Sequence, residues 1–118
     1  MLKKETPIFA SYNEKTNNAH FEFQYFRFSL CHEDSLFVPF SNDVAFFKEY
    51  LKYLEPTETP NGEKRFDGCG RNYYTKEQAK TMFERIKTDN PKEYTVLLKW
   101  LEKAILDSDC KGFYILGV

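Results

Sequence analysis

The chain has 118 residues, of which 42% are hydrophobic, 30% charged and 18% aromatic, and its formal net charge is −1. This size and balance exclude a disordered chain and predict a single domain, residues 1–118, whose core needs no metal or disulfide. The small net charge argues against a protein that grips nucleic acid by electrostatic attraction, so we expect no nucleic-acid partner.

Membrane insertion and export are not expected from this sequence. No stretch approaches the roughly 20 apolar residues of a membrane span, and residues 1–7 are too polar for a signal peptide. The three cysteines, Cys31, Cys69 and Cys110, are odd in number and widely spaced, which is typical of free thiols in a reducing compartment. We therefore expect a cytoplasmic protein without membrane contact.

Residues 20–30 alternate as a strand does, with Phe21, Phe23 and Tyr25 on one face. From Phe26 onward the apolar positions move to the other face, which predicts a β-bulge at this point. Residues 35–40 indicate a second strand that ends at a sheet edge, because it contains a proline. Residues 32–34 then form the turn of a hairpin, and residues 6–12 are a further candidate for a short strand.

A first helix is predicted from Ser41 to about Leu54, because Ser41 and Asn42 are good capping residues and Pro56 stops the helix. Residues 55–65 indicate a polar loop. The predicted inward stripe of the helix consists of Val44, Phe47, Leu51 and Leu54. Three more aromatic residues lie beside this stripe: Phe46, Tyr50 and Tyr53.

Two further helices follow in the sequence. Thr75 and Gln78 have the spacing of a capping box at the start of the second helix, whose predicted stripe is Ala79, Met82, Phe83 and Ile86. Asn90 is the predicted cap of the third helix, with Pro91 and Glu93 in its first turn. The predicted stripe of that helix contains Tyr94, Leu97, Leu98, Leu101, Ala104 and Ile105, and Trp100 lies off it.

The last segment, residues 112–118, is a continuous apolar run typical of a buried strand. Strands and helices do not alternate strictly along the chain, so the sequence does not predict repeated βαβ units. We expect the α+β class, with a mainly antiparallel sheet of four to five strands and about three helices packed on it.

Residues 66–80, FDGCGRNYYTKEQAK, place Cys69 between two glycines ahead of the second predicted helix. A phosphate loop is not indicated, because Tyr73 stands where a dinucleotide fingerprint needs its third glycine. A nucleophilic Cys69 would need a base, and nothing local ties His20 or His32 to it. We interpret the stretch as a turn in which glycine permits positive φ, followed by a short strand.

No metal, cofactor or catalytic residue is predicted. Cys31, His32, Cys69 and Cys110 lack the paired spacing of structural zinc sites. The turn of residues 32–34, HED, collects groups suited to acid–base chemistry, but no second cluster completes a triad. We interpret it as a solvated turn.

The aromatic surplus is the strongest functional signal, with 12 Phe, 8 Tyr and 1 Trp. Aromatic residues are enriched at the energetic centres of protein interfaces. Residues at the edges of the predicted stripes, together with the acidic turn, are therefore the predicted binding residues: Phe46, Tyr50, Tyr53, Trp100, Glu33 and Asp34. The alternative that these aromatic residues cover a second layer of core stays open.

These features favour a non-catalytic protein-binding or inhibitory domain, in particular a bacterial immunity-type protein that neutralises a toxin by covering its active site. Two alternatives remain. One is a small enzyme that uses Cys69 or the acidic turn, and the other is an accessory domain whose extra aromatic residues form a homodimer face. The expected partner is a protein, and the chain itself is expected to be a monomer or a homodimer.

Overall fold

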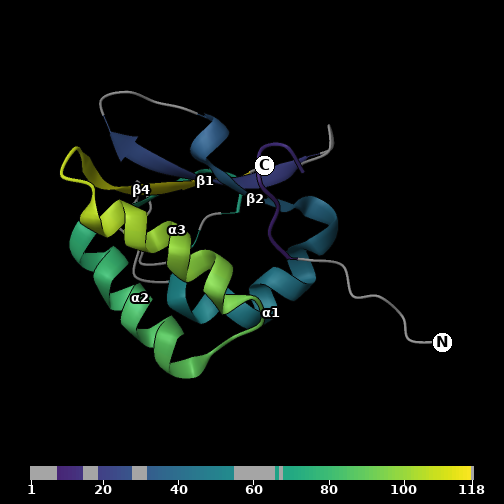
Figure 1. The fold of residues 1–118 in the computed structure, drawn as a ribbon. Helices are drawn as coiled ribbons and strands as arrows, with labels where there is room; N and C mark the ends of the chain where they lie inside the picture. Colours follow the sequence, from purple (N-terminus) through teal and green to yellow (C-terminus); the bar gives the residue numbers. More distant parts are fainter. Residues whose placement is uncertain (1–7, 15–18, 28–31, 55–65, 67, 118) are drawn as a thin grey trace.

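The computed structural model describes residues 8–14, 19–27, 32–54, 66 and 68–117. Its sheet contains the strands β1 (His20–Arg27), β2 (Leu36–Pro39), β3 (Arg71–Thr75) and β4 (Cys110–Leu116), all antiparallel, in the order β2–β1–β4–β3. Three helices, α1 (Asp43–Leu54), α2 (Lys76–Asp89) and α3 (Tyr94–Leu106), lie together on one side of the sheet (Figure 1). The predicted α+β class is confirmed.

The last strand, β4, occupies an interior position of the sheet, between β1 and β3. Its apolar sequence fits this position, because the side chains of an interior strand have neighbours from two strands on each face of the sheet. Phe113 and Ile115 point toward the helices and are fully buried. Tyr114 and Leu116 alternate with them on the opposite face and are half-buried.

An irregularity occurs at the end of β1, next to the predicted position, but it is not a bulge of the first strand. Phe26 pairs with Gly112 and Arg27 pairs with Cys110, so the extra residue, Lys111, lies on β4 rather than on β1. The bulge brings Arg27 opposite the buried Cys110, at the end of the sheet that faces the last turn of α3.

The hairpin of β1 and β2 is also confirmed, with the short 3-10 helix η1 (His32–Asp34) in its connection. Beyond β2, the predicted strand at residues 6–12 is only an isolated bridge in the described part of that segment. Ala10 and Phe37 exchange two backbone hydrogen bonds of 2.8 Å. Ile8 and Phe9 continue from this bridge into the core, where both are buried.

Helix α1 follows a second 3-10 turn, η2 (Phe40–Asn42), and it is rotated relative to its predicted orientation. Val44 is 77% exposed and Leu51 is 36% exposed, so the prediction that both point inward is wrong. The residues that α1 buries are Phe46, Tyr50, Tyr53 and Leu54. Because the large apolar residues of α1 span about half of its circumference, more than the core covers, the core buries the side with the largest aromatic area.

The predicted start of α2 is confirmed, and that of α3 is wrong. Thr75 and Gln78 form the reciprocal capping box. Asn90, however, ends α2 in the left-handed conformation, with φ of 51°, and its N–H bonds to the carbonyl oxygen of Ile86. Asn tolerates positive φ better than most residues, so one asparagine that resembles an N-cap can equally end the preceding helix.

Helix α3 instead begins directly after Glu93, whose side chain does not cap it. The Glu93 carboxylate accepts hydrogen bonds from the backbone N–H groups of Ile8, at 2.6 Å, and Phe9, at 3.3 Å. This carboxylate therefore holds the N-terminal segment against the start of α3. Such a contact between residues more than 80 positions apart leaves no local mark in the sequence.

Candidate functional site

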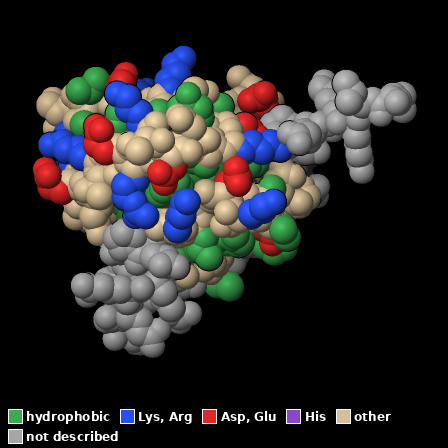
Figure 2. All heavy atoms as spheres, turned by 90° about the horizontal axis from the view of Figure 1, so that it is seen from below, with side chains coloured by type: hydrophobic (Ala, Val, Ile, Leu, Met, Phe, Trp, Pro, Cys, Tyr) green, Lys and Arg blue, Asp and Glu red, His purple; other side chains and the backbone are tan. Residues whose placement is uncertain are grey.

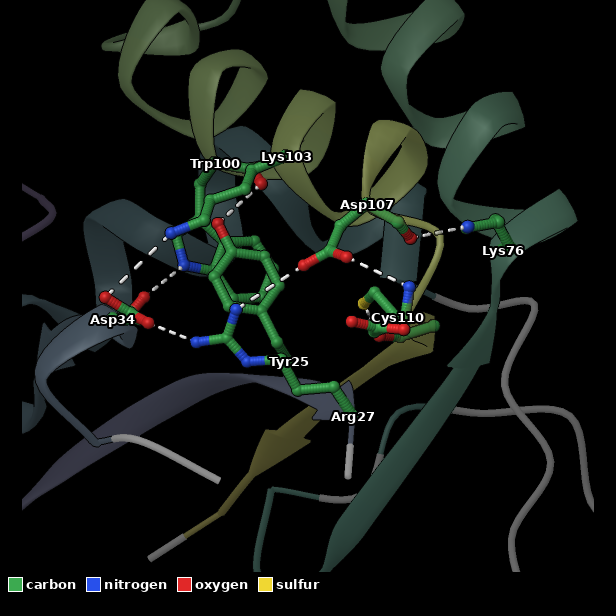
Figure 3. Close-up of polar contacts among 10 residues, drawn as sticks. Tyr25, Arg27, Asp34, Lys76, Trp100, Lys103, Asp107 and Cys110 are labelled. Atoms are coloured by element: carbon green, nitrogen blue, oxygen red, sulfur yellow. Dashed lines mark hydrogen bonds and ion pairs between the residues drawn. The ribbon is translucent and has the colours of Figure 1, made fainter. Parts of the chain in front are cut away.

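The densest polar cluster of the described residues surrounds Arg27, at the end of β1 (Figure 3). Its guanidinium group forms ion pairs with Asp34 of η1 and with Asp107, the residue that ends α3, the latter at 3.5 Å. The ammonium group of Lys103 lies 3.9 Å from the Asp34 carboxylate. Two cations and two carboxylates thus balance each other in this cluster.

The aromatic ring of Trp100, on α3, packs against this cluster. Its ring stacks on that of Tyr25, with centroids 4.0 Å apart and planes inclined by 11°. The Tyr25 hydroxyl donates a hydrogen bond to the Trp100 carbonyl oxygen at 2.8 Å, and the indole N–H donates one to the Asp34 carbonyl oxygen at 2.9 Å. Trp100 and Asp34, both predicted binding residues, therefore contact each other directly.

The phenol of Tyr25 is held in its neutral form. Burial raises the pKa of Tyr25 well above its ordinary value, and the neighbouring Cys110 and Asp34 raise this pKa further, whereas Arg27 lowers it. A phenol with such a pKa keeps its proton at neutral pH. It serves here as a hydrogen-bond donor rather than as an acid that exchanges its proton.

The contacts of this cluster favour a structural role. Arg27 is already neutralised by two carboxylates, so it lacks the excess positive charge that an anion site needs. Cys110, three residues after Asp107, is 2% exposed and its Sγ atom lies 3.0 Å from the Gly112 carbonyl oxygen. The cluster joins β1 and η1 to the last turns of α3.

The three predicted binding residues of α1 lie in the core and not on a contact face. Phe46, Tyr50 and Tyr53 are fully buried, so the prediction that they form a contact surface for a partner is wrong. The hydroxyl of Tyr50 donates to the Lys92 carbonyl oxygen, and that of Tyr53 donates to the Asp89 carboxylate at 2.7 Å. These tyrosines combine buried rings with hydroxyl groups that bond to the last residue of α2, Asp89, and to Lys92 in the segment between α2 and α3.

Trp100 is also a poor candidate for direct contact, since it is only 8% exposed. Of the six predicted residues, Glu33 alone is exposed. The rings predicted to remain outside the core instead form a continuous aromatic interior, in which Phe46 contacts the rings of Phe9, Phe21 and Phe23 at centroid distances of about 6 Å.

The thiols and possible metal ligands are not assembled into a site in the described part of the chain. Cys69 is exposed in the turn that precedes β3, as the interpretation of this stretch as a turn requires. No group of three His, Cys, Asp or Glu side chains among the described residues has the arrangement of a metal site. Cys31 and the side chain of His32 lie outside the described part.

A different aromatic cluster lies on the face of the sheet that points away from the helices. It consists of Phe26, Tyr73 and Tyr114, and we call it, together with Arg71, the outer-face patch. The ring centroids are 5.2 Å apart for Phe26 and Tyr114, 5.2 Å for Tyr73 and Tyr114, and 5.6 Å for Phe26 and Tyr73. The Arg71 guanidinium lies over the Tyr114 ring at 5.6 Å.

Sequence reasoning missed the outer-face patch, although one signal for it was present. In β3 the exposed residues Arg71, Tyr73 and Thr75 alternate with the buried Asn72 and Tyr74. This alternation shows that two opposite faces exist, but the sequence does not tell which strands lie beside β3. The three rings come together only because Tyr73 of β3 pairs with Tyr114 of β4, and β4 also pairs with β1, which carries Phe26.

The patch also has a structural role, because Tyr73 covers a glycine of the neighbouring strand. A Cβ atom added at Gly112 would lie 3.2 Å from the Tyr73 hydroxyl oxygen, so the tyrosine occupies the space that the glycine leaves free. Aromatic side chains commonly cover glycines across strands in this way. Tyr73 nevertheless stays 36% exposed, and Arg71 is exposed.

The helix side of the molecule differs from the outer-face patch. Figure 2 views it from below the sheet and shows Lys and Arg side chains interspersed with Asp and Glu. Such a mixed surface produces no strong electrostatic field of one sign.

Within the described ranges, no helix is both long and apolar enough to cross a membrane.

Comparison with models of known protein families, with curated proteins and with solved structures finds no match to this chain.

Proposed function

We propose that this protein is a non-catalytic protein-binding domain and that the outer-face patch is its principal contact surface. The observation that supports this proposal is the grouping of Phe26, Tyr73, Tyr114 and Arg71 on one face of a rigid sheet. Tyrosine and arginine are among the residues most enriched at the centres of protein interfaces. Their rings are already ordered by mutual contact, so binding would cost little side-chain entropy.

In its more specific form, the proposal is that the domain acts as an immunity-type protein and neutralises a toxin by covering the toxin's active site. An aromatic face on a small domain suits this task, because an inhibitor of this kind needs contact area and no chemistry of its own. The proposal moves the contact surface from α1, where the predicted aromatic residues are buried, to β1, β3 and β4.

The test begins with coexpression of this chain and the product of a neighbouring gene. We expect the two proteins to copurify at equal stoichiometry, and calorimetry then gives the dissociation constant. Arg71→Ala and Tyr114→Ala should each weaken binding by about tenfold or more, the effect of removing a residue at an interface centre. Lys99→Ala, which removes an exposed cation from α3, is the matched control and should leave the affinity unchanged.

Circular dichroism should show that both patch variants keep their fold. The proposed surface would be wrong if folded Arg71→Ala and Tyr114→Ala proteins bound the partner as tightly as the unmodified chain. A light-scattering mass of twice 14.1 kDa that falls to the monomer mass in both variants would instead assign the patch to a homodimer.

A further inference from the structure

A shallow hollow lies between α2 and α3, on the side of the molecule opposite the outer-face patch. Its volume is about 220 Å³, and its apolar lining comes from Phe83, Ile105 and Leu106. Leu106, at the end of α3, is 74% exposed. Pockets for small molecules usually have volumes of about 300–1,000 Å³, so this hollow is better matched to one or two side chains of a protein than to a separate ligand.

Both helices that border this hollow, which we call the α2–α3 groove, carry a negatively charged residue beside it. Glu84 lies on α2 and Glu102 lies on α3, and both residues are exposed. In the described part of the chain, neither side-chain carboxylate has a hydrogen-bond or ion-pair partner. The cation on the rim, Lys80, lies 3.3 Å from the Glu77 carboxylate instead. The groove therefore combines an apolar floor with two carboxylates that form no ion pair with a cation of the described residues.

The exposed side of α1 has the complementary pattern. Val44 and Leu51 lie seven residues apart, on one stripe of the helix, and are 77% and 36% exposed. Lys48 lies between them on the same stripe and is also exposed. This α1 stripe, Val44–Lys48–Leu51, places one cation between two apolar side chains that the fold leaves in water.

We propose that the α1 stripe of one copy of this protein binds in the α2–α3 groove of a second copy. Val44 and Leu51 would cover Phe83, Ile105 and Leu106, and the Lys48 ammonium group would lie between Glu84 and Glu102. Helix-in-groove binding uses this combination of apolar side chains at helical spacing and charges at the rim. The proposal does not depend on the proposed function, because it uses the helices and not the outer face of the sheet.

The predicted contact joins two different surfaces of the same chain. Each copy then keeps one free stripe and one free groove, so association continues to rings or open chains unless one of the surfaces is blocked. The contact is one helix wide, which is typical of weak and reversible association. This head-to-tail geometry leads to a specific test.

The test is sedimentation equilibrium from roughly 10 μM to 1 mM, the range in which weak interfaces associate. The unmodified chain should show an average mass that rises with concentration above 14.1 kDa. The groove variant, Glu84→Lys with Glu102→Lys, should be monomeric, and so should the stripe variant, Lys48→Glu. Mixing the two variants pairs opposite charges in both possible contacts, the intact stripe with the intact groove and the reversed stripe with the reversed groove, so the mixture should associate again and its average mass should rise above 14.1 kDa.

Asp109→Lys is the control, because it makes the same charge change as each single substitution of the groove variant, at an exposed position outside the groove, and should associate as the unmodified chain does. Circular dichroism verifies that every variant is folded. The proposal is overturned if the unmodified chain stays monomeric at 1 mM. It is also overturned if association persists in both variants, or if their mixture contains no dimer.

Discussion

The indole N–H of Trp100 donates a hydrogen bond of 2.9 Å to the carbonyl oxygen of Asp34, which lies 66 positions earlier in the chain. This bond ties α3 to η1, and the stacked ring of Tyr25 fixes the indole from its other side. Trp100 and Asp34 were both predicted to bind a partner. Their contact closes the fold around Arg27.

Replacement of Trp100 by Phe should destabilise the protein without abolishing its fold. The Asp34 carbonyl oxygen would lose its donor, and the smaller ring would leave part of the space beside Tyr25 empty. We expect a loss of about 2 kcal/mol in the free energy of unfolding. Urea denaturation, followed by fluorescence of tyrosine and by circular dichroism, measures this loss. A change below about 0.5 kcal/mol would contradict the structural role.

Two substitutions in α1 test its observed orientation. Phe46→Ala removes a fully buried ring from the centre of the aromatic core and should cost about 3–5 kcal/mol of stability. Val44→Ala changes a residue that is 77% exposed and should alter stability by less than about 0.5 kcal/mol. Thermal and urea denaturation of dilute samples compare the two. The orientation would be wrong if Val44→Ala were the more damaging change.

Gly112 is a position where the sheet requires glycine. Its φ is +152°, and a Cβ atom there would lie 2.1 Å from the Tyr74 carbonyl oxygen. We therefore expect Gly112→Ala to destabilise the protein by about 3 kcal/mol or more. Gly68→Ala is the matched control, because a Cβ atom at Gly68 would meet nothing within 4 Å. Equal melting temperatures for the two variants would disprove the constraint at Gly112.

Alkaline pH should weaken the fold through its buried tyrosines. Burial, as the largest cause, and the hydrogen bond to Asp89 together raise the pKa of Tyr53 from 10.0 to about 12. Between these two pH values the folded state binds more protons than the unfolded state, so stability falls as pH rises. The slope from Tyr53 alone approaches about 1.4 kcal/mol per pH unit.

Denaturation series at several pH values from 9 to roughly 12 measure this slope. Tyr53→Phe removes the titrating group, so the variant should lose stability less steeply than the unmodified chain over the same window. Its stability at neutral pH should be lower by about 1 kcal/mol, because the hydrogen bond to Asp89 is lost. Identical slopes for the two proteins would show that Tyr53 does not contribute to the pH dependence.

Local signals in the sequence were sufficient for much of the fold. The capping box of Thr75 and Gln78, the edge proline of β2 and the apolar run of β4 each depend on neighbours within a few residues, and all three predictions are confirmed. Propensity and alternation act over such short distances, so they identify a helix or a strand without knowledge of the rest of the chain.

The candidate site could not be found in this way, because burial depends on which elements meet. An aromatic stripe on α1 has the same sequence whether it faces the core or the solvent, and the tertiary packing buried Phe46 while it left Val44 in water. The outer-face patch exists only because β4 pairs with both β1 and β3. The sequence by itself determined the kinds of elements and most of their limits, whereas the tertiary structure decided which rings form the core and which remain at the surface.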